Sequence, residues 1–74
     1  MELKDFIVNF AAQFDDTDAS EFKADTKFKE LDDWTSLTAL SVIAMVDEEY
    51  NVSISSDMIK ESETIEDLFD KINK

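Results

Sequence analysis

The 74-residue chain contains no cysteine, no histidine, no glycine and no proline. Without a thiolate or an imidazole, it lacks the groups needed for most nucleophilic catalysis and for most zinc, copper and haem sites. No disulfide can stabilise so short a chain, so its fold depends on a packed core. Because glycine and proline mark most tight β-turns, their absence favours helices over hairpins.

Positive charge is also scarce, since seven lysines stand against nineteen acids and the net charge is −12. A protein that binds phosphate backbones needs a basic face, so we exclude nucleic acid as a partner. Partners guided by charge are expected to be basic. The chain has no basic segment followed by an apolar leader and no apolar run of membrane-spanning length. We therefore expect a soluble, cytoplasmic monomer without membrane insertion.

Hydrophobic residues make up 43% of the chain and include six Phe, which is enough for one folded domain over residues 1–74. The segment from Leu3 to Phe14 has the i, i+3, i+4, i+7 spacing of an amphipathic helix. Its apolar positions are Leu3, Phe6, Ile7, Phe10, Ala11 and Phe14. This first segment is expected to bury one face against the rest of the domain.

A long polar connection follows, and its apolar residues Phe22, Phe28 and Leu31 are expected to anchor it to the core. A short turn is expected near residues 20–23. The run from Asp16 begins like a calcium loop, with acids at Asp16 and Asp18 after Asp15. However, Glu21 stands where that loop needs Gly, and Lys27 stands where it needs a bidentate Glu. We therefore predict a solvated loop without a metal.

The second half of the chain predicts three further helices. One should run from about Ser36 to Tyr50, with Asn51 in the left-handed position that often ends a helix. A brief extended piece and a short helix opened by Ser55 or Ser56 should follow. The last helix should begin after Thr64, with a capping box to Asp67 and with Lys71 and Lys74 near its end. The predicted fold is an all-α, small four-helix bundle with three main helices and one short one.

The helix from Ser36 is apolar on two sides. One side carries Ala39, Val42, Ile43, Val46 and Tyr50, and the other carries Leu37, Leu40 and Ala44 beside Ser41, Asp47 and Glu48. A small bundle has difficulty burying both sides of one helix, so the second side is predicted to dock a partner. The alternative is that the loop of residues 15–33 covers Leu37 and Leu40.

Ser36 stands at the start of this helix and has two interpretations. Ser is among the best N-cap residues, so it could simply cap the helix. As a nucleophile acting alone it has no His to serve as its base, and although the sequence leaves a Ser–Lys pairing open, no Lys lies within a helical turn of Ser36. If Thr35 or Asp33 supplies the cap, the Ser36 hydroxyl is left available for modification by another enzyme.

The stretch "TSLTALSVIAMVDEEYNVSI" resembles the signature of acyl carrier proteins. That signature is Asp-Ser-Leu at the start of the second helix, then an apolar run, acids, an aromatic residue and β-branched residues. Ser36 and Leu37 match it directly. Further matches are Asp47, Glu48, Glu49, Tyr50, Val52 and Ile54. The resemblance covers essentially the whole chain and is most specific from Ser36 onwards.

The resemblance implies that Ser36 carries a covalent 4′-phosphopantetheine arm, added by a phosphopantetheinyl transferase from coenzyme A with Mg²⁺. It implies that partner enzymes contact Leu37, Leu40, Ala44, Asp47 and Glu48. It implies that an acyl pocket is lined by Ala39, Val42, Ile43 and Val46. Three positions depart from the family pattern: Thr35 replaces the Asp, Trp34 replaces a common Gly, and Ser41 replaces a usual acid.

The resemblance thus identifies a non-enzymatic acyl carrier that delivers thioester-bound acyl groups to enzymes with basic docking surfaces. The departures favour a specialised lipid, polyketide or related pathway over bulk fatty acid biosynthesis. A peptidyl or aminoacyl carrier is the neighbouring alternative. A different class remains open as well: an unmodified acidic module that binds a basic partner without using Ser36.

Overall fold

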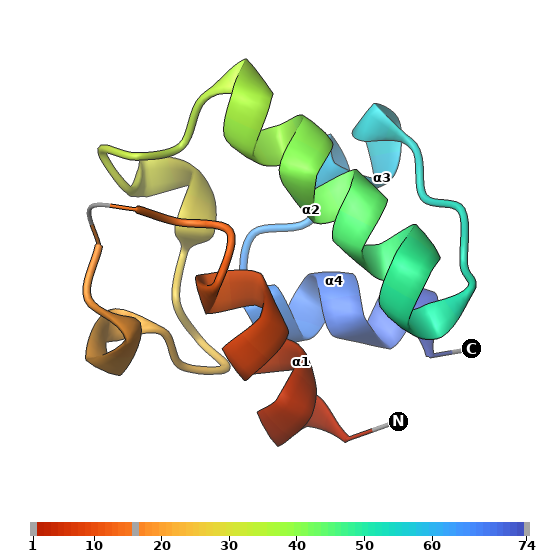
Figure 1. Ribbon diagram of the computed structural model, residues 1–74, viewed down its shortest axis with the longest axis horizontal. Coiled ribbons are helices and arrows are strands. Elements are labelled where there is room, and N and C mark those ends of the chain that lie inside the picture. The colour runs from red at the N-terminus through yellow and green to blue at the C-terminus, as the bar shows by residue number, and fades with distance from the viewer. Residues whose placement is uncertain (1, 16, 74) are drawn as a thin grey trace.

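The computed structural model describes residues 2–15 and 17–73 and confirms a small all-helical bundle (Figure 1). Its elements in chain order are α1 (Leu3–Ala11), the 3₁₀ turns η1 (Ala19–Glu21) and η2 (Phe28–Glu30), α2 (Ser36–Tyr50), α3 (Ser56–Glu61) and α4 (Ile65–Ile72). Helix α1 packs on α2 and α4, and the short α3 contacts both α2 and α4. No helix within the described ranges is both long enough and apolar enough to cross a membrane.

Helix α1 ends three residues before the predicted end at Phe14. The backbone N–H groups of Gln13 and Phe14 bond the carbonyls of Phe10 and Ala11, at 3.1 and 3.0 Å. These i→i−3 bonds tighten the chain and turn it out of the α-helix. Phe14 is still buried, so its apolar character contributes to the core although it lies outside the helix.

The connection between α1 and α2 is ordered by its aromatic residues, as predicted. Phe22 and Phe28 are buried, and Leu31 packs against the core. A turn at η1 lies close to the predicted position, and Asp18 caps it by accepting a bond from the Ser20 N–H at 2.9 Å. The Ser20 N–H is the main cause that lowers the pKa of the Asp18 carboxyl, and the Ser20 side chain lowers it further. Asp16, the other calcium-loop acid, lies outside the described residues.

Helix α2 has the bounds predicted from the sequence, and Asn51 ends it with φ 56° and ψ 38°. Asn is one of the few residues other than Gly that adopts this left-handed conformation readily. The Asn51 N–H bonds the Asp47 carbonyl at 3.0 Å. Because α2 ends sharply at Asn51, residues 52–55 lead directly into α3, whose first turn is capped by the extended Ser55.

Helix α4 begins with the predicted capping box. The Thr64 side chain accepts from the Asp67 N–H at 3.1 Å, and the Asp67 carboxylate accepts from the Thr64 N–H at 3.3 Å. A further bond from the Glu63 N–H is the largest cause that lowers the pKa of Asp67. Lys71 lies in the last turn, where it complements the helix dipole. Lys74 lies outside the described residues.

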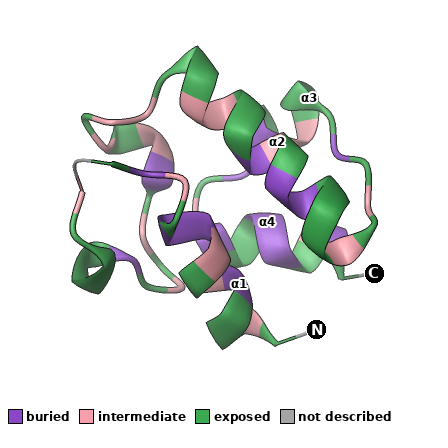
Figure 2. Ribbon diagram, in the orientation of Figure 1, coloured by how far each residue is buried: buried purple, intermediate pink, exposed green. Residues whose placement is uncertain are grey.

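The buried residues of α1, α2 and α4 face one another and form the core (Figure 2). The most deeply buried large side chains are Phe6, Phe10, Phe28, Ile65, Leu68, Val42 and Val46. Rings from α1, from the connection and from α2 are in mutual contact, and one such pair is Phe6 with Tyr50 at 5.8 Å between centroids. The buried side of α2 therefore faces these rings, which leaves its other side and its first turn toward solvent.

Candidate functional site

Ser36 is the first residue of α2, and Thr35 is the residue that caps the helix. The Thr35 hydroxyl accepts from the Thr38 N–H at 3.3 Å, and the Thr38 hydroxyl donates to the Asp33 carbonyl at 2.8 Å. The N-cap interpretation of Ser36 is therefore wrong. Ser36 is exposed, and within the described part of the chain its hydroxyl makes no hydrogen bond. The hydroxyl is available to a reagent in solution.

The start of α2 suits a negatively charged substituent. The first N–H groups of a helix have no intrahelical acceptor, and the helix dipole places partial positive charge there. Although the chain has nineteen acids, none lies in the first turn of α2. A phosphodiester on Ser36 would thus meet free N–H groups and no carboxylate within that turn.

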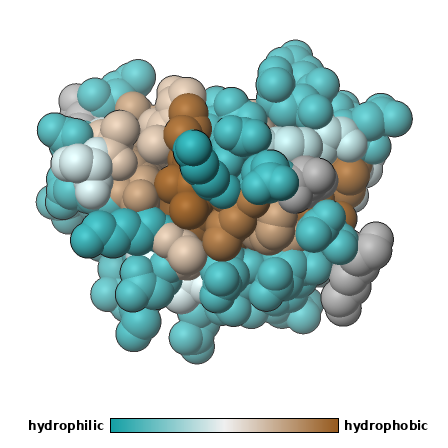
Figure 3. All heavy atoms as spheres, turned by 90° about the horizontal axis from the view of Figure 1, so that it is seen from below, coloured by the Kyte–Doolittle hydropathy of each residue, from teal (hydrophilic) through white to brown (hydrophobic). Residues whose placement is uncertain are grey.

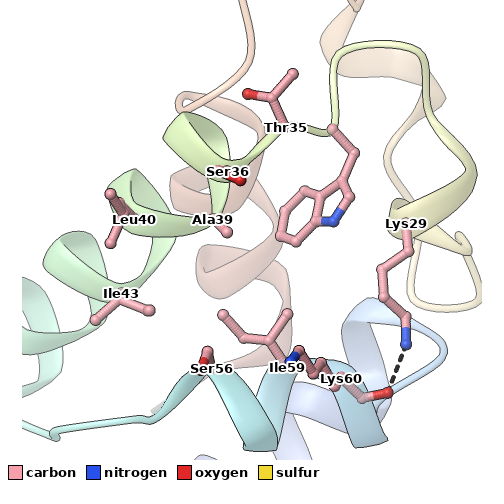
Figure 4. Close-up of a pocket in the computed structure, with 10 residues that line it drawn as sticks. Lys29, Thr35, Ser36, Ala39, Leu40, Ile43, Ser56, Ile59 and Lys60 are labelled. Carbon is pink, nitrogen blue, oxygen red and sulfur yellow. Dashed lines mark hydrogen bonds between the residues drawn. The ribbon is translucent and has the colours of Figure 1, made fainter.

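A pocket of about 600 Å³ opens beside Ser36, between α2 and α3 (Figure 4). It is lined by Lys29, Trp34, Thr35, Ser36, Ala39, Leu40, Ile43, Ser56, Ile59 and Lys60. Ile59 of α3 lies across the pocket from Ala39 and Ile43 of α2. The lining is mainly apolar, and its volume falls in the range of small-molecule sites.

The structure separates the four residues that the resemblance assigned to an acyl pocket. Ala39 and Ile43 line the pocket described above. Val42 and Val46 are fully buried in the core and do not line it. The helical repeat explains this division, because residues four apart share a face: Ala39 and Ile43 lie on one face of α2, and Val42 and Val46 lie on another, which is buried.

Five residues of the pocket were not predicted from the sequence. One lies just before Ser36, and the other four come from segments that are distant from Ser36 in the sequence. They are Lys29, Trp34, Ser56, Ile59 and Lys60. The sequence identified Trp34 only as a departure from the family pattern and assigned it no role in a pocket. The Lys29 Nζ donates to the Lys60 carbonyl at 2.7 Å and so joins the connection to α3. No periodic signal could have shown that α3 and η2 meet beside Ser36, because that contact is tertiary.

The second apolar side of α2 is open to solvent. Leu37 and Leu40 are 77% and 62% exposed, and Ala44, Asp47 and Glu48 are exposed as well. The alternative that residues 15–33 cover the two leucines is wrong. That segment folds back instead, where Ala24 and Thr26 accept backbone bonds from the start of α4. We call the residues Leu37, Leu40, Ala44, Asp47 and Glu48 the α2 stripe.

A second hollow lies over α1 and the start of the connection that follows it. Figure 3 shows apolar residues on this face, surrounded by hydrophilic ones. The hollow is lined by Lys4, Ile7, Val8, Ala11, Ala12, Phe14, Thr17, Ala19, Phe22, Lys23 and Ala24. Val8 is 63% exposed there. Since it carries no residue at the start of α2, this hollow is separate from the Ser36 pocket.

A family model described as a phosphopantetheine attachment site matches residues 5–72. The chain belongs to this family. Comparison with curated proteins and with solved structures gives no match. Members of this family are carriers with covalently attached 4′-phosphopantetheine, and they are typically not catalytic themselves. They interact with phosphopantetheinyl transferases and with acyl-handling enzymes.

The site residues fit the cofactor of a phosphopantetheine carrier. Attachment needs an accessible hydroxyl, and Ser36 supplies one in the first turn of a helix. An apolar pocket lies beside this hydroxyl and could accommodate part of the arm. The chain contains no Cys, so a thiol could come only with a covalently attached group such as this cofactor.

Proposed function

We propose that Ser36 is the attachment point of 4′-phosphopantetheine and that this carrier presents acyl thioesters to partner enzymes. The observation that supports it most is the state of the Ser36 hydroxyl. It is exposed at a helix N-terminus, relieved of capping by Thr35, and adjacent to an apolar pocket. All three features lie inside the segment matched by the family model.

Ser36 would act as a passive acceptor in the attachment reaction. A bond forms between its Oγ and a phosphorus of coenzyme A, the pyrophosphate bond breaks, and the adenosine bisphosphate half leaves. The hydroxyl proton passes to a base of the transferase, because the carrier has no His and no described side chain accepts a hydrogen bond from the Ser36 hydroxyl. When bound, the group supplies the thiol on which acyl groups are carried.

The pocket between α2 and α3 is proposed to shelter the acyl group. Ala39, Ile43 and Ile59 give it an apolar surface, and apolar groups leave water favourably for such a surface. Val42 and Val46 would support the pocket from behind as part of the core rather than touch the cargo.

The α2 stripe is proposed to bind the partner enzymes. Its exposed Leu37 and Leu40 supply apolar contacts, and Asp47 and Glu48 can pair with Lys or Arg on a basic docking surface. Thr35, Trp34 and Ser41 differ from the pattern of fatty acid carriers, so we assign the protein to a specialised lipid, polyketide or related pathway.

The test is the intact mass of the protein after incubation with coenzyme A, Mg²⁺ and a broad-specificity phosphopantetheinyl transferase. We expect one phosphopantetheine per chain, mapped to the peptide that contains Ser36, and none on the Ser36→Ala variant. Ser55→Ala is the matched control, because Ser55 is also an exposed serine at a helix start. It should still be modified. An unmodified wild-type chain would favour the unmodified interaction module instead.

A further inference from the structure

Trp34 is the single Trp of the chain and lies two residues before Ser36. It is half-buried and lines the Ser36 pocket. Helices α2 and α3 supply two walls of this pocket, and Trp34 with Lys29 supplies the wall that neither helix provides. The size of the space beside Ser36 therefore depends on a side chain that comes from the connection before α2.

The indole is backed by the aromatic side of the core. Its ring stacks on Phe14 at 6.2 Å between centroids with an interplanar angle of 24°. It meets Phe28 edge-on at 5.0 Å and 68°. Phe28 is fully buried and is itself in contact with Phe10 at 5.1 Å. These ring contacts restrict the movement of the indole away from the pocket.

Lys29 keeps the same wall in place from the surface side. Its Nζ donates to the Lys60 carbonyl in the last turn of α3 at 2.7 Å, while its side chain lines the pocket next to Trp34. Figure 4 shows this bond between the connection and α3. The connection and α3 are thus joined at the edge of the pocket, and the wall is held at both ends.

We propose that Trp34 is the residue that limits the length of the cargo, and that the carrier takes aliphatic acyl groups of short to medium length. The inference rests on the proposed function, because it assumes that the cargo enters the pocket beside Ser36. Each methylene that enters leaves water favourably until the chain reaches the indole. Beyond that point an added methylene stays in water or has to displace closely packed rings, which is unfavourable.

The experiment compares wild type with Trp34→Leu, which keeps the position apolar but removes the indole. Both proteins are loaded from acyl coenzymes A whose saturated chains run from four to twelve carbons, and intact mass confirms a single addition. Thermal unfolding then gives the gain in Tm over the form with the bare arm. In the wild type, the gain in Tm should stop rising at a certain acyl chain length. In the variant, it should stop rising at a chain that is two or more carbons longer.

The fluorescence of Trp34 gives a second readout in the wild type. Its emission should shift at the chain length where the gain in Tm stops, because that is where the cargo reaches the indole. Phe22→Leu is the matched control, since Phe22 is a buried ring in contact with Phe10 and Phe14 but does not line this pocket. It should lower Tm and leave the length limit unchanged.

The same length limit in wild type and Trp34→Leu, or an emission that never changes along the series, would overturn the inference. Failure of the proposed function is recognised separately, because intact mass would then show no arm. In that case the unmodified protein is titrated with free acyl pantetheines of the same lengths. The Trp34 emission should still shift at one chain length, and the affinity should fall for chains longer than that. If the emission does not shift at that length, the inference is rejected independently of the arm.

Discussion

At the scale of single residues, the site depends on a division of roles between two adjacent hydroxyl side chains. Thr35 accepts the N–H bond that a helix start requires, and Ser36 is left without an internal partner among the described residues. In the family pattern an Asp occupies the position before the serine, and an Asp would cap equally well. Thr35 thus preserves the cap while removing a negative charge next to Ser36, the proposed attachment point.

This division predicts different costs for two similar substitutions. Thr35→Ala removes the cap of α2 and should lower the free energy of unfolding by about 0.5–2 kcal/mol. Ser36→Ala removes an exposed hydroxyl without a partner and should change it by less than about 0.5 kcal/mol. Urea denaturation measures both, and Thr35→Ser serves as the control that retains a capping hydroxyl. Equal costs for the two alanine variants would show that Ser36 contributes to the cap after all.

At the scale of elements, α2 buries one side in the core and exposes the other side to solvent. Val42, Met45 and Val46 are buried, and Leu37 and Leu40 are the most exposed large apolar side chains of the helix. Exposed leucines on a helix flanked by acids have no stabilising role that the structure shows. Because they lie close to Ser36, we propose that an enzyme that modifies Ser36 contacts them.

We therefore expect Leu37→Ala to slow modification of Ser36 without unfolding the protein. Loss of one interface contact of about 1 kcal/mol or more corresponds to a fall in kcat/KM of about fivefold or more. The measurement is the rate of arm addition by the transferase, with thermal unfolding in parallel. Val8→Ala is the control, because Val8 is 63% exposed on α1, away from the stripe. If the arm is added to both variants at equal rates, the α2 stripe does not contact the transferase.

At the scale of the whole molecule, a small aromatic core is opposed by strong self-repulsion. Nineteen acids and seven lysines surround a core built around six Phe and one Trp. Repulsion among like charges destabilises a compact state, whereas burial of aromatic rings stabilises it. By electrostatics alone, the same charge disfavours binding to nucleic acid and favours the basic docking surfaces that we propose for its partners.

Screening of this repulsion should raise Tm. At about 0.1 M salt the Debye length is about 10 Å, so separated surface acids are then largely screened from one another. We expect Tm to rise as sodium chloride is added from low ionic strength. Chloride is preferred to sulfate, because sulfate stabilises proteins by exclusion from their surface.

The control is a variant with Asp47→Asn, Glu48→Gln and Glu49→Gln, which lowers the number of exposed acids on α2. Its Tm should be less sensitive to salt than that of the wild type. A wild-type Tm that is unchanged or lowered by sodium chloride would mean that self-repulsion is not a significant part of its stability.

The local elements were determined by the sequence itself, because their causes are local. Apolar spacing and the αL preference of Asn51 set the bounds of α2, and the Thr64–Asp67 capping box sets the start of α4. The family signature around Ser36 also needed no coordinates. The prediction for α1 was three residues too long at Phe14, since a buried ring has the same pattern whether the helix continues or turns.

The surroundings of Ser36 were decided only by the tertiary structure. Which hydroxyl caps α2 depends on the path of the chain before the helix, and two candidates stood in the sequence. Whether Leu37 and Leu40 are covered depends on where the connection packs. The pocket itself exists because α3 and Lys29 approach α2 through contacts between distant segments. Such contacts are set by packing of the whole chain, and no periodicity along the sequence records them.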